Sequence, residues 1–190
     1  MRGAGLAAAW LLAASALVAT PAAATLPFPA QIGGAFTLTD HTGAPRTERD
    51  PKGHPQLVFF GYATCEQICS VALPVMAEAA ALAEAEGLAL TPVMITVDPD
   101  RDTPAAMAQA LARHHAGFVG LTGDQAALQH AYDLFGVESS VVFTDPVLGP
   151  IYAHGSFIYL LDGDGIVLSV LPPILTAERI VEILRARTAS

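Results

Sequence analysis

The sequence predicts an α/β fold in which a central mixed β-sheet carries helices on both faces. Two observations lead to this prediction. Short apolar runs suited to buried strands alternate along the chain with longer segments of helical periodicity. The last two expected strands, 157–161 and 166–171, are joined only by the turn sequence DGDG at 162–165. So short a connection makes a hairpin, which adds antiparallel pairing to the sheet.

Residues 1–24 have the pattern of an export signal. Arg2 supplies a positive charge, 6–18 is an apolar run, and Ala22 to Ala24 offer the small residues of a cleavage site. The alternative is an uncleaved membrane anchor. We therefore expect a periplasmic or otherwise exported protein. Its membrane association would come only from this segment, which, if retained, would anchor it in the inner membrane facing outward.

Residues 25–190 are expected to form a single domain, and its first half contains three elements of clear type. Segment 35–39 alternates in the way of a strand and is followed by a turn at 41–43. Segment 57–60 is wholly apolar and predicts a buried strand. Segment 70–86 has Ala, Leu and Glu in helical rhythm and is followed by Gly87, a typical helix stop.

The middle of the chain predicts a strand and then a helix. Segment 90–97 is rich in β-branched residues and is expected to be a strand. The helix is expected to begin at Pro104, with Thr103 or Asp102 as its N-cap, and to continue to about His115.

The remaining elements have similar signals. A short strand is expected at 118–121 and a helix at 124–135, ended by Gly136. A strand at 141–143 precedes an insert with Pro and Gly at 145–150. After the hairpin, Thr176 is expected to cap a last helix that runs to about Arg187.

The chain is acidic, with 18 Asp and Glu against 9 Lys and Arg and a formal charge of −9. No cluster of basic residues occurs in it. Proteins that bind nucleic acid depend on such clusters to neutralise phosphates, so we expect no nucleic-acid partner.

Cys65 and Cys69 are the only cysteines, and they follow the buried strand in the sequence VFFGYATCEQIC. If a helix begins near Cys65, the pair lies at positions i and i+4 on one helix face, with Cα atoms about 6 Å apart. This separation is compatible with a disulfide, and it is equally compatible with a binding site in which two sulfurs coordinate a soft metal ion. A disulfide with a purely structural role would close a very short loop and would therefore stabilise the fold only slightly.

Four segments of the chain resemble the Sco/SenC family of copper-binding, cytochrome c oxidase assembly proteins, which have a thioredoxin-like fold. They are GGAFTLTDHTG, FFGYATCEQIC, TVDPDRDTP and HGSFIYLLDGDG, and the resemblance extends over residues 33–186. The CxxxC spacing is its most specific feature, since thioredoxin itself has two residues between its cysteines. The resemblance implies a thioredoxin-like domain over residues 25–190 and copper, as Cu(I) or Cu(II), at a dithiol site.

The resemblance also implies a third ligand, His154, just ahead of an apolar strand. From the residues alone, a single histidine on a small-residue turn is more often structural than a ligand. Two thiolates and one imidazole favour Cu(I), whereas zinc usually requires a fourth ligand. His114, His115 and His130 fall within expected helices, where we expect surface or packing roles.

The acidic loop that follows the strand 90–97 contains a further candidate, Asp98. It leaves the sheet at the edge where α/β folds gather their functional loops, so it could approach the dithiol as a residue supporting the ligands. The alternative is that Asp98 fixes the loop by pairing with Arg101.

Two residues depart from the family pattern. Glu66 stands where the family usually has proline, and its charge disfavours a neighbouring thiolate. Ala153 stands where an aspartate is common, which affects the choice of partner.

The function expected from the resemblance is that of an exported copper chaperone rather than an enzyme. It would receive copper at Cys65, Cys69 and His154 and pass it to an apo-metalloprotein, in particular the dicopper (CuA) centre of cytochrome c oxidase. Its expected partners are an oxidase subunit or other copper acceptor, a copper donor and a thiol reductant. The alternative is a thiol-disulfide reductase that uses Cys65 and Cys69 as catalytic residues, cycling through their disulfide, to keep the oxidase cysteines reduced.

Overall fold

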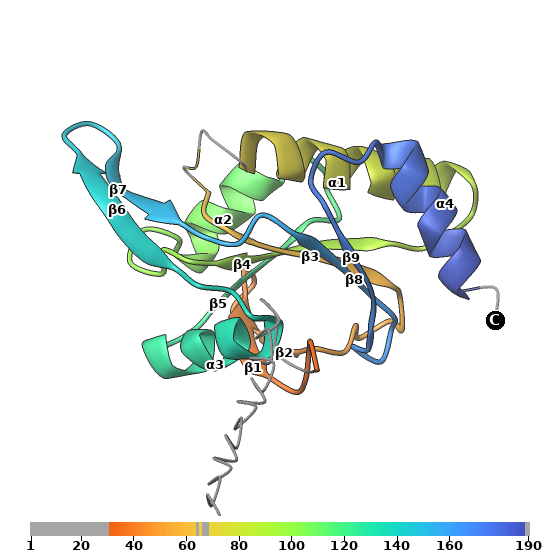
Figure 1. Ribbon diagram of the computed structural model, residues 1–190, viewed down its shortest axis with the longest axis horizontal. Helices are drawn as coiled ribbons and strands as arrows, with labels where there is room; N and C mark the ends of the chain where they lie inside the picture. The colour runs from red at the N-terminus through yellow and green to blue at the C-terminus, as the bar shows by residue number, and fades with distance from the viewer. Residues whose placement is uncertain (1–30, 64, 66–68, 189–190) are drawn as a thin grey trace, which may run out of the picture.

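The computed structural model describes residues 31–63, 65 and 69–188. Its elements alternate between strands and helices (Figure 1). In chain order they are β1 (Thr37–Asp40), β2 (Pro45–Thr47), β3 (Gln56–Gly61), α1 (Cys69–Ala85), β4 (Thr91–Thr96), α2 (Pro104–Leu111), β5 (Val119–Thr122), α3 (Gln125–Phe135), β6 (Ser140–Asp145), β7 (Gly149–Ala153), β8 (Ile158–Leu161), β9 (Val167–Leu171) and α4 (Ala177–Thr188).

The main sheet has the strand order β2-β1-β5-β4-β3-β8-β9. Strands β3, β4 and β5 are parallel, while β1, β2, β8 and β9 join by antiparallel pairing. The predicted mixed sheet is confirmed. Strands β6 and β7 pair with each other as a separate two-stranded sheet, which projects from the domain at the upper left of Figure 1.

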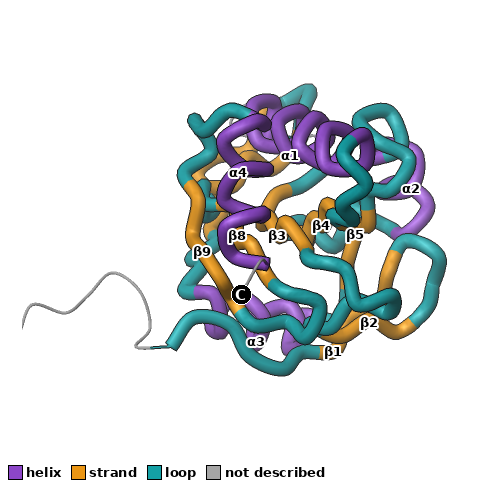
Figure 2. The backbone as a smooth tube through the Cα atoms, turned by 90° about the vertical axis from the view of Figure 1, so that its right-hand side faces the viewer, coloured by secondary structure: helices purple, strands orange, loops and turns teal. Residues whose placement is uncertain are grey.

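Helices cover both faces of the main sheet, as Figures 1 and 2 show, with α1, α2 and α4 on one face and α3 on the other. A hydrophobic core lies on each face of the main sheet. The central strand β3 contributes to both cores because its side chains alternate between the two faces. Leu57 and Phe59 pack under α1, whereas Val58 and Phe60 pack against α3. All four are almost completely buried, which explains why this strand is a continuous apolar run.

The topology brings three loops to one edge of the sheet. The parallel strands β3 and β4 end there, with Gly61 paired to Thr96. Strand β8 is antiparallel to β3 and begins at the same edge, where Ile158 pairs with Phe59. The loops after β3, after β4 and before β8 therefore meet, and these are the loops that contain the predicted site residues.

Several predicted caps are confirmed by their hydrogen bonds. The side chain of Thr103 accepts from the Ala106 N–H at the start of α2, and that of Thr176 accepts from the Arg179 N–H at the start of α4. Gly136 ends α3 in the left-handed conformation, with φ of 65°, a geometry that glycine adopts without a Cβ penalty.

Other boundaries differ from the prediction. Segment 145–150, expected as an insert, contains the last residue of β6, a turn at 146–148 and the first two residues of β7, which together form a β-hairpin. Helix α2 ends at Leu111, so His114 and His115 lie in the following turns and not within a helix. Helix α1 begins at Cys69, and Cys65 precedes it without helical structure. Residues 66–68 between the two cysteines lie outside the described residues, so the expected arrangement at i and i+4 on one helix face stays a prediction.

The predicted signal or anchor at 1–24 lies outside the described residues. None of the helices in the described part of the chain is long and apolar enough to cross a membrane.

Candidate metal centre

The structure brings Cys65, Cys69 and His154 together, although the histidine is far from the cysteines in sequence. Nε2 of His154 lies 3.9 Å from Sγ of Cys65 and 3.8 Å from Sγ of Cys69. The three ligand atoms all lie within 4.8 Å of one another. Among the described residues they form the one group of three or more His, Cys, Asp or Glu side chains able to hold a metal ion.

The tautomer of His154 is fixed by its other ring nitrogen. Nδ1 lies 3.0 Å from the carbonyl oxygen of Gly155. Since a carbonyl oxygen can only accept, Nδ1 must donate and therefore holds the proton of the neutral ring. The lone pair of the neutral imidazole is then on Nε2, the atom that faces both sulfurs. A hydrogen bond of this kind is typical of histidines that ligate metals.

The two thiols differ in their surroundings. Cys69 is 1% exposed, whereas Cys65 is only partly buried. The hydrogen bond with Cys65 and burial together raise the pKa of the Cys69 thiol. The absence of a side chain at Gly61 allows Cys69 to approach β3, because a Cβ there would lie 2.8 Å from its sulfur. Neither cysteine forms a disulfide in the structure, so the predicted bridge stays a prediction.

Two aromatic rings contact the imidazole of His154. The rings of Phe59 and Tyr62 each meet the imidazole edge-to-face, with centroids 5.8 Å apart. Tyr62 is itself buried, and desolvation together with the neighbouring Cys65 raises the pKa of its hydroxyl to about 12. At neutral pH the phenol is therefore uncharged. The imidazole is restrained by packing as well as by its hydrogen bond to Gly155.

The separations fit a three-coordinate ion. With a metal–sulfur bond of about 2.3 Å and a metal–nitrogen bond of about 2.0 Å, as at zinc sites, trigonal geometry places sulfur and nitrogen about 3.7 Å apart and tetrahedral geometry about 3.5 Å. The observed 3.8 and 3.9 Å are slightly longer than both values, so the nitrogen and the two sulfurs lie close enough together to bind one ion. Soft thiolates with low coordination number are the preferred environment of Cu(I).

Asp98 supports a neighbouring part of the structure and does not join the ligand group. Its carboxylate, 1% exposed, pairs with Arg101, which confirms the pairing expected from the sequence. It also accepts a hydrogen bond of 3.2 Å from the Tyr152 hydroxyl. The ring of Tyr152 contacts that of Tyr62, which in turn contacts His154. Asp98 is connected to the site through these two rings.

Asp102 has a role that the sequence did not reveal. The N-cap of α2 was expected to be Thr103 or Asp102, and Thr103 has that position. The buried Asp102 carboxylate instead accepts hydrogen bonds from the Ala63 N–H, at 3.1 and 3.2 Å, and from the Thr96 hydroxyl, at 2.6 Å. It therefore ties the loop that contains Cys65 to the end of β4. Two further acidic residues follow Asp98 in this loop, and nothing in the sequence distinguishes Asp102 from Asp100 in this respect.

The remaining histidines and the core methionines lie elsewhere. Nδ1 of His41 accepts from the Gly120 N–H, and His130 contacts the carbonyl of Ala35. Three methionines are completely buried in the core and do not join the ligand group: Met76, Met94 and Met107. Ala153 is exposed at the end of β7, and Glu66 lies outside the described residues.

Comparison with known proteins gives consistent matches over the same region. A model of the SCO1/SenC family matches residues 24–189. The protein SCO2 homolog of mouse mitochondria is 38% identical over 159 residues, which are 83% of this chain and 62% of that protein. A SCO2-like protein of Rickettsia conorii is 36% identical over 137 residues, which are 71% of this chain and 66% of that protein. The chain thus spans slightly less than two thirds of these relatives.

Solved structures agree with the sequence matches. ScoI of Bradyrhizobium japonicum with copper bound has a TM-score of 0.73 and 33% identity, covering 82% of this chain and 99% of that one. Yeast Sco1 with copper bound has a TM-score of 0.75 and 28% identity, covering 84% and 90%. The predicted thioredoxin-like fold is confirmed by these neighbours. With a family model that extends over nearly the whole chain and relatives above 30% identity, this protein belongs to the SCO1/SenC family.

Proposed function

We propose that this protein is an exported copper carrier. It binds one copper ion through Cys65, Cys69 and His154 and delivers it to an apo-metalloprotein, for which we propose the dicopper centre of cytochrome c oxidase. The observation that carries the proposal is the position of His154, whose Nε2 faces both sulfurs at 3.8 and 3.9 Å. The copper-bound ScoI and Sco1 structures support the choice of metal.

The exposure of the ligands supports transfer rather than permanent storage. Cys69 is buried, while Cys65 and His154 are only partly buried. Ligands of an acceptor protein could therefore replace Cys65 and His154 before the ion leaves Cys69. In this scheme the acceptor approaches the edge of the sheet at which β3 ends and β8 begins.

The proposal includes export and two further partners. Residues 1–24 have the pattern of a signal segment, which supports a periplasmic location, with or without retention in the inner membrane. Outside the cytoplasm thiols become oxidised, so a thiol reductant is needed to keep Cys65 and Cys69 competent for copper. A copper donor must supply the ion.

An anaerobic Cu(I) titration of the reduced protein tests the binding step. We expect one ion per chain, and either Cys65→Ser or Cys69→Ser should abolish tight binding, because the lost thiolate removes a third of the ligand set. His130→Ala is the matched control for loss of a histidine and should bind one ion normally. Unchanged stoichiometry and affinity in either serine variant would contradict the proposal.

The alternative function is a thiol-disulfide reductase, favoured by the pairing of a partly buried Cys65 with a buried Cys69. The Cys65 thiolate would attack a substrate disulfide, release one substrate thiol and form a mixed disulfide. Cys69 would then attack that bond, release the second thiol and leave a Cys65–Cys69 disulfide. A reductase has no need of His154, which separates the two functions experimentally.

A further inference from the structure

The ligand His154 follows directly from an element with little support of its own. It comes immediately after β7, and β7 pairs with β6 in a separate two-stranded sheet. A two-stranded hairpin is marginally stable in water. This hairpin also exposes several large apolar side chains: Val141, Val142, Phe143, Val147 and Leu148. The position of His154 therefore requires contacts that fix the hairpin to the domain.

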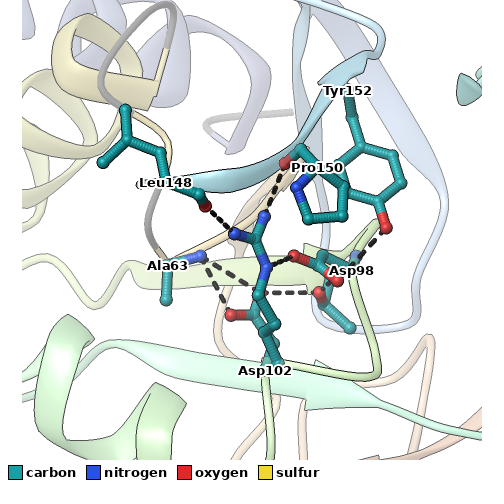
Figure 3. A network of polar contacts seen from close by, with 8 residues as sticks. Ala63, Asp98, Asp102, Leu148, Pro150 and Tyr152 are labelled. Atoms are coloured by element: carbon teal, nitrogen blue, oxygen red, sulfur yellow. Dashed lines mark hydrogen bonds and ion pairs between the residues drawn. The ribbon is translucent and has the colours of Figure 1, made fainter. Parts of the chain in front are cut away.

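Arg101 makes such contacts from the loop between β4 and α2. Nη2 donates to the Pro150 carbonyl at 2.7 Å, and Nη1 donates to the Leu148 carbonyl on the other side of Gly149 (Figure 3). Gly149 leaves room for this approach, since a Cβ there would lie 2.8 Å from Nη1 of Arg101. Two backbone groups at the start of β7 are thus bound by one side chain.

The third nitrogen of Arg101 anchors the arginine itself. Nε donates to the carboxylate of the buried Asp98, which also accepts from the hydroxyl of Tyr152 in the middle of β7 (Figure 3). The guanidinium lies 5.6 Å from the ring centroid of Tyr62, the same ring that meets His154 edge-to-face. Arg101 therefore contacts both the strand that leads to His154 and the ring that packs against it.

The chemistry of these contacts requires arginine. A guanidinium presents several donors in a rigid plane and can bind two carbonyls and a carboxylate at once. A lysine has the charge for Asp98 but concentrates its donors on one flexible atom. Bonds to a charged donor that is only 27% exposed are among the stronger hydrogen bonds in a protein.

We propose that Arg101 is a positioning residue that holds His154 against the dithiol by binding the start of β7. This inference rests on the proposed function of Cys65, Cys69 and His154 as copper ligands. Arg101 contributes to how firmly copper is held and not to how many ions bind, because Cys65 and Cys69 both follow β3 and neither is on β7. Replacing Arg101 should therefore weaken copper binding, because His154 would no longer be held close to the two sulfurs.

The test is a double-mutant cycle with Arg101→Ala and His154→Ala, measured as Cu(I) affinity against a competing chelator. Arg101→Ala should bind one ion about 10- to 100-fold more weakly, the usual effect of losing a residue that orients a ligand. Its Cu(II)–thiolate absorption should shift toward that of His154→Ala. In the His154→Ala background, Arg101→Ala should cause no further loss, since the residue acts through the histidine.

Two controls separate positioning from general damage. Arg49→Ala removes an exposed arginine that pairs with Asp164 elsewhere and should leave copper affinity unchanged. Arg101→Lys keeps the charge but not the three-way binding and should recover only part of the affinity.

Wild-type affinity and absorption in Arg101→Ala would overturn the proposal, and so would an equal loss in both backgrounds. If His154→Ala itself binds copper like the wild type, the proposed ligand set fails instead, which is a different result.

Discussion

The carboxylate of Asp102 accepts two hydrogen-bond contacts from the N–H of Ala63, 39 residues earlier in the chain. Ala63 precedes Cys65 by two residues and is half-buried, whereas Asp102 is buried. The loop between β4 and α2 therefore makes two attachments (Figure 3). Arg101 binds the hairpin that leads to His154, and Asp102 binds the segment that contains Cys65.

Asp102→Ala should destabilise the protein and weaken copper binding. The change leaves the Ala63 N–H and the Thr96 hydroxyl without their acceptor, and each unsatisfied buried group costs about 1–3 kcal/mol. Urea denaturation measures the stability, and chelator competition measures the affinity. Asp100→Ala is the control, because Asp100 is an exposed residue of the same loop. Equal behaviour of the two variants would show that Asp102 does not support the site.

Asp102→Asn should change how stability depends on pH. Burial raises the pKa of Asp102 above its ordinary value of 3.8, despite hydrogen bonds from Thr96 and Ala63 that lower it. The folded wild type therefore binds this proton more tightly than the unfolded chain does. Its stability relative to the asparagine variant should be greatest at low pH and should fall as pH rises from 3.8 through the higher folded pKa.

Urea denaturation of both proteins across this pH range gives the difference in free energy of unfolding. A difference that grows in favour of the wild type as pH rises would contradict the assignment of Asp102 as a carboxyl with a raised pKa.

Gly61→Ala should displace Cys69. The added Cβ would lie 2.8 Å from the Cys69 sulfur and 2.7 Å from the ring of Phe59, and overpacking a core in this way costs about 1–3 kcal/mol. We expect a lower free energy of unfolding together with weaker copper binding. Gly117→Ala is the matched control, since its Cβ would meet only the side chain of His115 on a surface turn. If Gly61→Ala has the same free energy of unfolding and the same copper affinity as the wild type, then Cys69 and Phe59 accommodate the added methyl group and Gly61 is not required for the position of Cys69.

Oxidation should switch copper binding off. The neighbouring thiols of Cys65 and Cys69 should form an internal disulfide in air, and that form offers no thiolate to Cu(I). Mass spectrometry identifies the bridged species, and a Cu(I) titration without reductant measures its capacity. Dithiothreitol followed by removal of the reductant should restore one ion per chain. Full uptake by the bridged protein would rule out the dithiol as the copper site.

The central strands β3, β4 and β8 could be predicted from sequence because they are buried on both faces and are therefore largely apolar. Strands β2 and β7 could not, since they contain Pro45 and Pro150, residues that usually indicate loops. Both strands lie at sheet edges, where proline is tolerated because a ladder hydrogen bond is not required on the outer side. The early end of α2 at Leu111 also had no signal, because neither Gly nor Pro follows until Gly117.

The candidate site was predicted in part. The CxxxC spacing pointed to Cys65 and Cys69, and the family resemblance added His154, which its local sequence alone did not identify as a ligand. The contacts of Arg101 with β7 and of Asp102 with Ala63 could not be predicted, because they depend on the parallel pairing of β3 with β4 and on the hairpin. Only the folded arrangement brings these loops together.

The central claim is that His154 acts as a copper ligand for delivery, and one measurement tests it directly. Copper-loaded wild type and His154→Ala are each mixed with an apo dicopper-domain acceptor, and formation of the acceptor's copper absorption is followed. Dithiol exchange with a model disulfide is measured on the same samples. We predict that His154→Ala keeps its dithiol exchange rate, because both sulfurs remain, but loses copper early and fails to load the acceptor. Delivery by His154→Ala that equals the wild type would contradict the carrier function and favour the reductase.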